Sequence, residues 1–204
     1  RRLWSGEKVE LEIPGNQTRG ILLYPKPVQK ELPIWVTASG NPATFIHAGE
    51  IGANLLTHLL GQSPEELKAR IELYQQARKK AGFEGEGKIT LMLHTYIGDT
   101  ESDAIAQAKV PMKNYLKSSF GLISQLAESL GFAKEISSLS EEDLDTVLEY
   151  AFERYYQDSS LIGAPEKCTK TLISLMEVGV TEFACLIDFG IEHEEVLRGL
   201  KRLN

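Results

Sequence analysis

Apolar and polar residues follow two rhythms that alternate along the chain. Short, nearly continuous apolar runs are typical of strands buried on both faces, and each is followed by a segment with apolar residues at helical spacing. The expected strands cover Ile34–Ala38, Ala53–His58, Ile89–Ile97 and Glu182–Phe189. Strand and helix in repeated succession predict parallel strands joined by crossover helices.

Helix starts and stops mark the segments between these strands. Asn41 before Pro42 predicts a cap and first turn for a helix that runs to about Glu50. Ser63-Pro64-Glu65-Glu66 has the form of a capping box and opens the clearest helix of the chain. Further helices are expected after Asp99, from Gly163–Glu166 to Gly179, and over His193–Leu203.

Two stretches do not follow the strand-helix rhythm. Residues 1–32 are punctuated by glycine and proline and predict a connecting segment, with a small hairpin from the alternating residues near Val9–Ile13 and Ile21–Leu23. Residues from about 109 to 160 exceed the length of a crossover and predict a helical insertion, with a second helix start at Ser140. Residues 33–204 then form the main body, which is either a small open sheet or half of an eight-stranded barrel. The hydrophobic periodicity fits both architectures.

Composition narrows the classes of partner. The 204 residues have a net charge of −7, with 42% hydrophobic and 25% charged residues, as in an ordinary globular chain. An acidic chain without a basic cluster argues against nucleic acid, and no apolar run is long enough to cross a membrane. Two cysteines, Cys168 and Cys185, predict no disulfide framework, a cytoplasmic location and two small buried side chains.

Five segments, in order along the chain, resemble luciferase-like flavin-dependent monooxygenases. They are Pro33–Asn41, Ala48–Leu56, Thr95–Thr100, Leu161–Glu166 and Ala184–Gly190. The last two look most like the subgroup found in natural-product assembly lines. The resemblance implies strands five to eight, the C-terminal half, of a TIM-type (β/α)₈ barrel. It further implies that the partner is either the missing N-terminal half or a second copy of the chain.

The resemblance also indicates where a cofactor would lie. Family members hold the phosphate of flavin mononucleotide (FMN) at the loop after the fifth strand, and this carries over to Ser39, Gly40, Asn41 and Thr44. Backbone donors at a helix N-terminus suit a phosphate, and a glycine allows close approach. The bland alternative is an ordinary strand-to-helix turn. The basic residue that commonly assists from an earlier strand is absent from this chain.

Two histidines are the catalytic candidates. His58 and His94 lie at expected C-terminal strand ends, where a (β/α)₈ barrel builds its active site, and either could orient a flavin. A hydrogen-bonded structural histidine is the equal alternative for each. Asp188 could touch a ligand but is favoured as a polar strand-end residue, and Trp35 is favoured as barrel core. Histidine and cysteine spacings predict no metal site.

The function that the resemblance implies is oxygenation of a small or carrier-bound organic substrate by reduced flavin and O₂, in secondary-metabolite biosynthesis. The cofactor supplies the chemistry, and the protein orients the substrate and excludes water. Two alternatives remain: a non-catalytic half-barrel that holds flavin or mediates oligomerisation, and a different α/β enzyme with an open parallel sheet.

Overall fold

A computed structural model describes residues 1–15, 17–118 and 140–203, which divide into two compact units. The first unit, Arg1–Ile34, contains the antiparallel hairpin of β1 (Val9–Ile13) and β2 (Gln17–Ile21). The hairpin was predicted, although its second strand begins four residues earlier than expected. The second unit, Trp35–Asn204, carries every candidate site residue.

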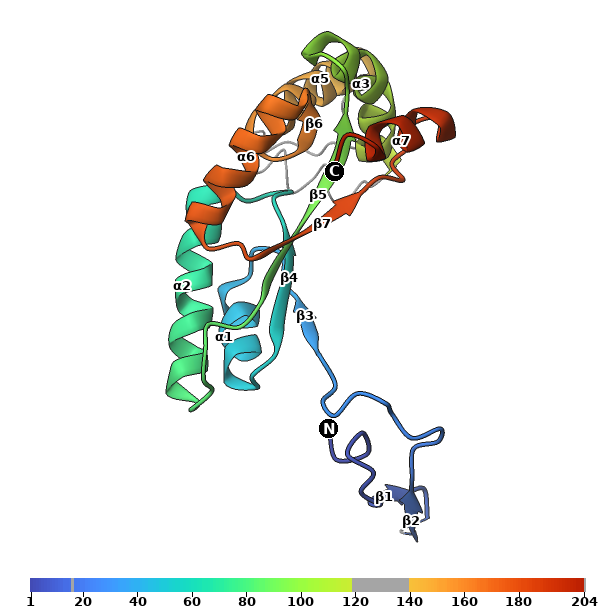
Figure 1. Ribbon diagram of the computed structural model, residues 1–204, viewed down its shortest axis with the longest axis vertical. Coiled ribbons are helices and arrows are strands. Elements are labelled where there is room, and N and C mark those ends of the chain that lie inside the picture. The colour runs from blue at the N-terminus through green and yellow to red at the C-terminus, as the bar shows by residue number, and fades with distance from the viewer. Residues whose placement is uncertain (16, 119–139, 204) are drawn as a thin grey trace. The chain divides into compact units, whose positions relative to one another are not determined.

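The second unit is built on a sheet in which every strand pair is parallel (Figure 1). Its strands are β3 (Trp35–Thr37), β4 (Asn54–His58), β5 (Ile89–Ile97), β6 (Leu161–Gly163) and β7 (Glu182–Leu186). The four predicted strands pair in the sequential order β3, β4, β5, β7, as expected. The short β6 was not predicted, because its three residues directly precede a helix start; it pairs with the last residues of β5.

The helices begin where the sequence signals place them. They are α1 (Pro42–Glu50), α2 (Pro64–Lys80), α3 (Glu101–Ser118), α5 (Glu141–Asp158), α6 (Pro165–Val178) and α7 (His193–Leu200). Asn41 caps α1 by accepting from the Ala43 N–H, and Ser63 forms the complete capping box of α2 with Glu66. Each cap satisfies an N–H group that a helix otherwise leaves without a partner.

The first residues assigned to the predicted insertion belong to α3. Residues 109–118 continue this helix without a break, and it accommodates Pro111. The predicted helix start at Ser140 is confirmed, because the Ser140 side chain accepts from the Asp143 N–H at the start of α5. Residues 119–139 of the predicted insertion lie outside the described residues.

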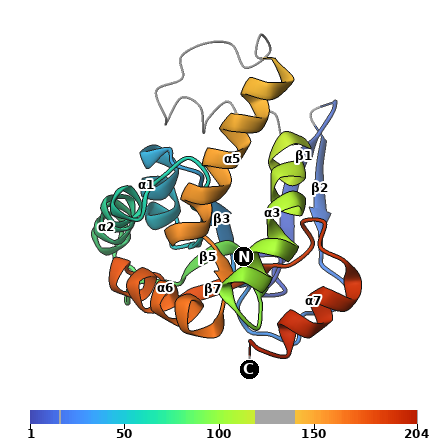
Figure 2. The ribbon, with the colours of Figure 1, turned by 90° about the horizontal axis from the view of Figure 1, so that it is seen from above.

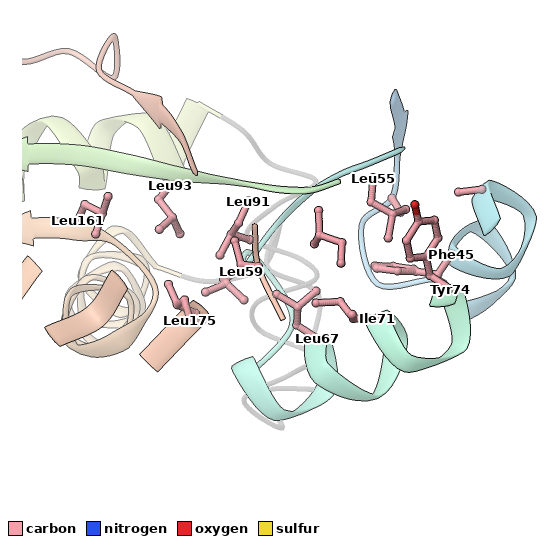
Figure 3. Close-up of a cluster of buried hydrophobic side chains, with 14 of the residues drawn as sticks. Phe45, Leu55, Leu59, Leu67, Ile71, Tyr74, Leu91, Leu93, Leu161 and Leu175 are labelled. Carbon is pink, nitrogen blue, oxygen red and sulfur yellow. The ribbon is translucent and has the colours of Figure 1, made fainter. Parts of the chain in front are cut away.

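One apolar core joins the sheet to α1, α2 and α6 (Figure 3). Alternate strand residues such as Leu55, Leu91 and Leu93 meet Leu67 and Ile71 of α2 there, all nearly inaccessible to solvent. A second cluster links α3 and α5 to the end of β5 and includes Phe152 and Phe189. Viewed along the perpendicular direction, α3 and α5 run side by side (Figure 2).

The opposite face of the sheet is covered by α3 and α5 at the end of β5 and is open around Trp35. Trp35 was expected in the core, but 37% of it is exposed, and its indole N–H donates to Thr90 Oγ1 at 2.9 Å. Because side chains alternate across a strand, Leu56 and Met92 share this face, and both are only half-buried. Parallel sheets are normally covered on both faces, so this surface lacks a cover within the described residues.

The two cysteines differ in exposure. Cys168 is buried as predicted, whereas Cys185 of β7 was expected to be buried and is exposed. No helix in the described ranges combines the length and apolar character needed to cross a bilayer.

Candidate functional site

The candidate residues gather at the edge where the parallel strands end. Ser39, Gly40 and Asn41 follow β3, His58 is the last residue of β4, and His94 lies near the end of β5. Asp188 lies two residues beyond β7, which is shorter than predicted, and its side chain is exposed. The carboxyl edge of parallel strands is where α/β folds build ligand sites, because several loops converge there.

The loop after β3 presents unused backbone donors. Gly40 has φ +92°, which glycine adopts without strain, and Asn41 Oδ1 accepts from the Ala43 N–H at 3.0 Å. None of the described residues accepts a hydrogen bond from the backbone N–H groups of Ser39, Gly40 or Asn41. Successive free N–H groups beside a helix N-terminus form a concave site that favours an anion.

Thr44 is the fourth residue carried over to this loop. It lies in the first turn of α1, where its backbone N–H donates to the Asn41 carbonyl at 3.1 Å, and its side chain is half-buried. The loop as a whole has the donors that a phosphate group requires.

His58 is held as a neutral ring. The Leu60 N–H donates to His58 Nδ1 at 3.1 Å, which requires an unprotonated Nδ1 and leaves the proton on Nε2. Burial lowers the pKa of His58, because the charged ring would lose water contacts. The side chain is half-buried, so an Nε2–H donor faces the strand-end region without carrying charge.

His94 is more deeply buried and is enclosed by aromatic rings. Its ring centroid lies 4.7 Å from that of Tyr115 and 5.3 Å from that of Phe189, both edge-on. Burial, and to a smaller extent the nearby His58, lowers the pKa of His94 to about 4, against an opposing effect of Asp188. His94 Nδ1 lies 3.0 Å from the Tyr155 hydroxyl, whereas Nε2 has no partner among the described residues.

Tyr155 is the hydrogen-bond partner of His94 Nδ1. Burial raises the pKa of Tyr155, so its hydroxyl stays protonated. A protonated Tyr155 and a neutral His94 can share this hydrogen bond in either direction. The two predicted histidines lie close enough to interact electrostatically, and the lowered pKa of each keeps both rings neutral.

Sequence reasoning missed three residues of this region. Gln62 is 2% exposed, and its amide donates to Thr57 Oγ1 at 3.1 Å and to the His58 carbonyl. Arg70 Nη1 donates to Gln62 Oε1 at 2.5 Å, and Tyr155 contacts His94 from α5. Of these three, only Arg70 could have been suspected from the sequence. It lies beside the buried stripe of Leu67, Ile71 and Tyr74 on α2, and a long side chain at such a position can extend beyond its own helix.

Comparison with known sequences identifies a matching family and a curated relative. The family model described as luciferase-like monooxygenase matches residues 1–182. The oxygenase component of a flavin-dependent trigonelline monooxygenase from Acinetobacter baylyi is 26% identical over 182 residues. That match covers 88% of this chain and 49% of the relative, so the chain spans about half the length of the curated relative it matches.

Solved structures share the fold. A monooxygenase from Streptomyces bottropensis superimposes with a TM-score of 0.68 at 18% identity, over 99% of this chain and 55% of its own. The oxygenating constituent of Pseudomonas putida 3,6-diketocamphane monooxygenase, in complex with FMN, gives 0.67 at 16%, over 99% and 58%. A coenzyme F420-dependent tetrahydromethanopterin reductase from Methanopyrus kandleri gives 0.68 at 19%, over 98% and 58%. At these identities the likeness concerns the fold alone.

Proposed function

Because the chain belongs to the luciferase-like monooxygenase family, we propose that it forms the part of a flavin-dependent monooxygenase that holds the cofactor phosphate. The observation that carries this proposal is the row of free backbone N–H groups at Ser39, Gly40 and Asn41, next to the N-terminus of α1. A phosphate needs several donors close together, and this loop would offer three successive backbone N–H groups. Thr44 adds a hydroxyl one turn into the helix.

FMN is the proposed cofactor. Reduced flavin, when bound, activates O₂ for transfer of one oxygen atom to an organic substrate. The residues of this chain would bind the flavin and orient it against the substrate. His58, neutral and protonated on Nε2, would donate one hydrogen bond to the flavin or the substrate without bringing a charge into the site, and the neutral His94 would lie beside it. The aromatic rings around His94 would exclude water from that part of the site.

The strands β3, β4, β5 and β7 would be strands five to eight of a (β/α)₈ barrel. Three facts support this: their sequential parallel order, the open face that carries Trp35, and coverage of only 49% of the curated relative. The other half of the barrel, from the same polypeptide or a second copy, would cover that face and supply the remaining contacts to the substrate.

The substrate would be a small or carrier-bound organic molecule in secondary metabolism. This part of the proposal rests on the resemblance of Leu161–Glu166 and Ala184–Gly190 to assembly-line members of the family. The relatives described as an oxygenase component and an oxygenating constituent suggest that a separate protein would supply the reduced flavin. A non-catalytic half-barrel that holds flavin is the second candidate, favoured by the uncovered sheet face.

Equilibrium dialysis against FMN, riboflavin and F420 tests the cofactor. We expect FMN to bind, and the joint substitution of Ser39→Glu and Asn41→Glu to weaken binding at least tenfold through repulsion of the phosphate. Gln76→Glu with Thr169→Glu adds the same charge at exposed helical positions and should leave affinity within twofold. Unchanged affinity in the first variant would put the phosphate elsewhere, and preference for F420 would make the protein a deazaflavin enzyme.

Oxygen chemistry separates the two candidates. The whole open reading frame that contains these residues, supplied with reduced FMN, should consume O₂ faster when its substrate is present. A protein that binds FMN but shows no such response with candidate substrates, even with a complete barrel, would be the flavin-holding module.

A further inference from the structure

Arg70 of α2 faces the loop that follows β3. A methyl group at Gly40 would lie 3.8 Å from Arg70 Nη1 and 4.0 Å from Nη2, and its three nearest heavy atoms would all belong to this guanidinium. The sequence within residues 39–44 carries no charge of its own, so Arg70 provides the cation nearest to Gly40.

Gln62 holds Arg70 in this position. Its buried amide is fixed to the end of β4 by hydrogen bonds to Thr57 Oγ1 and the His58 carbonyl, and its Oε1 accepts from Arg70 Nη1. An arginine restrained in this way has lost most of its side-chain freedom before any ligand arrives. Little further entropy is lost when it binds, which favours affinity.

Arg70 keeps donors and charge to spare. A guanidinium has five N–H donors, and Gln62 is the one hydrogen-bond acceptor that the described residues offer it. Glu66 lies 3.8 Å from Nη2, but that carboxylate is 55% exposed and also accepts from the Ser63 N–H, so it neutralises Arg70 only in part. The Arg70 side chain is 16% exposed, and limited solvent strengthens its field at the loop.

We propose that Arg70 is a phosphate-binding residue, which gives this chain its own basic partner for the loop Ser39–Thr44 and sets its preference for FMN over unphosphorylated flavin. Gln62 acts as the residue that positions it. The inference rests on the proposed function, since it assigns the contact of a flavin phosphate. Arginine is suited to the task because its planar fork can donate two parallel hydrogen bonds to phosphate oxygens.

The test compares FMN with riboflavin, which differ only in the phosphate. Equilibrium dialysis of the full chain, with both flavins oxidised and again after dithionite reduction under argon, gives a ratio of the two affinities. Arg70→Met should lower FMN affinity roughly tenfold to hundredfold and leave riboflavin affinity within about twofold, because a charge-assisted hydrogen bond is lost only with FMN. Arg70→Lys, which keeps the charge without the fork, should give an intermediate ratio.

Two further variants separate binding from folding. Lys68→Met removes the same charge from an exposed position on α2 and should leave the ratio unchanged. Gln62→Met keeps the Arg70 guanidinium but removes the acceptor that positions it. It should lower the ratio of FMN to riboflavin affinity less than Arg70→Met does. Unfolding in urea identifies any variant that loses stability, and the ratio remains interpretable because riboflavin reports on the rest of the site.

The outcomes separate the role of Arg70 from the proposed function of the chain. If FMN binds and Arg70→Met leaves the ratio of FMN to riboflavin affinity unchanged, Arg70 does not contact the phosphate, and the proposed function stands without it. If neither flavin binds the chain in either redox state, the proposed function is wrong for this chain and the role of Arg70 falls with it. A loss of both affinities by the same factor would show that Arg70 supports the fold rather than the phosphate.

Discussion

At the scale of single residues, the main property of His58 and His94 is that both rings are uncharged near neutral pH. An exposed histidine titrates near pH 6.5, whereas burial lowers the pKa of His58 and brings that of His94 to about 4. Both rings therefore stay neutral at physiological pH, and His58 Nδ1 is fixed as an acceptor by the Leu60 N–H. A neutral imidazole held in this way suits orientation of a ligand better than proton transfer.

The shifted pKa of His94 has a measurable effect on stability. Because the unfolded chain binds a proton near pH 6.5 and the folded chain only near pH 4, this contribution is fully present above pH 6.5 and is lost as pH falls toward 4. From pH 7 to pH 5, His94 should remove about 2 kcal/mol from the free energy of unfolding. Urea unfolding at both pH values should show that His94→Gln loses less stability over this range than the unmodified chain.

His47→Gln is the matched control for that experiment. His47 is exposed on α1, so its replacement should leave the difference between pH 7 and pH 5 unchanged. An equal pH dependence in the unmodified chain and His94→Gln would show that His94 is protonated as readily when folded as when unfolded.

At the scale of elements, α1 and α2 pack through a glycine. A methyl group at Gly49 would lie 2.4 Å from the Tyr74 carbonyl oxygen and 2.9 Å from the Arg78 backbone nitrogen. Both contacts are with backbone, which cannot rotate away as a side chain can. Gly49 therefore sets how closely α2 approaches α1, and with it the reach of Arg70 to the loop at Gly40.

Gly49→Ala should destabilise the chain by about 1–3 kcal/mol or more, the usual cost of overpacking. Helix propensity alone predicts the opposite, a gain of roughly 0.5–1 kcal/mol. Gly199→Ala in α7 is the control, because a methyl group there would meet its nearest neighbour at 3.4 Å, an ordinary contact. Thermal or urea unfolding of both variants measures the change in stability. A Gly49→Ala chain that is more stable than the unmodified chain would contradict the close packing.

The same elements show what a sequence can and cannot predict. The capped starts of α1 and α2 were predictable because Asn41, Ser63 and Glu66 act on N–H groups only a few residues away. The proximity of Arg70 to Gly40 was not, because it depends on the packing of two helices whose spacing a single glycine determines. Tyr155 was hidden for a similar reason, since it meets His94 across 61 residues of chain.

Secondary structure was least predictable where local signals conflicted. Leu161–Gly163 pairs as a strand although a helix begins at Pro165, because β5 extends beyond β4 and offers free backbone groups to it. Residues from about 109 were assigned to an insertion, yet α3 continues through Pro111. In both places tertiary packing outweighed the local preference.

At the scale of the whole molecule, the open sheet face predicts association. Trp35, Leu56 and Met92 lie on a part of the sheet face that the described helices do not cover, and uncovered apolar surface and sheet edges favour contact with another chain. Light scattering of the 204-residue chain should therefore give a mass above that of the monomer, increasing with concentration.

Substitutions on the two surfaces test this explanation. Trp35→Glu places a charge on the open face and should shift the chain toward the monomer, whereas Ile173→Glu changes an exposed apolar residue of α6 and should not. A monodisperse monomer with a cooperative melt in the unmodified chain would show that the open face needs no partner.

The pairing of β5 with β7 has a consequence for biosynthesis. Ile89–Ile97 forms the middle of the sheet, yet its partner Glu182–Leu186 lies some ninety positions further along, after α3, α5 and α6. At roughly 5–20 residues per second, the ribosome needs about 5–20 s to make that intervening stretch. During this interval the nascent chain presents an apolar strand whose second neighbour has not yet been translated, which makes β5 the segment where chaperone binding during synthesis is expected.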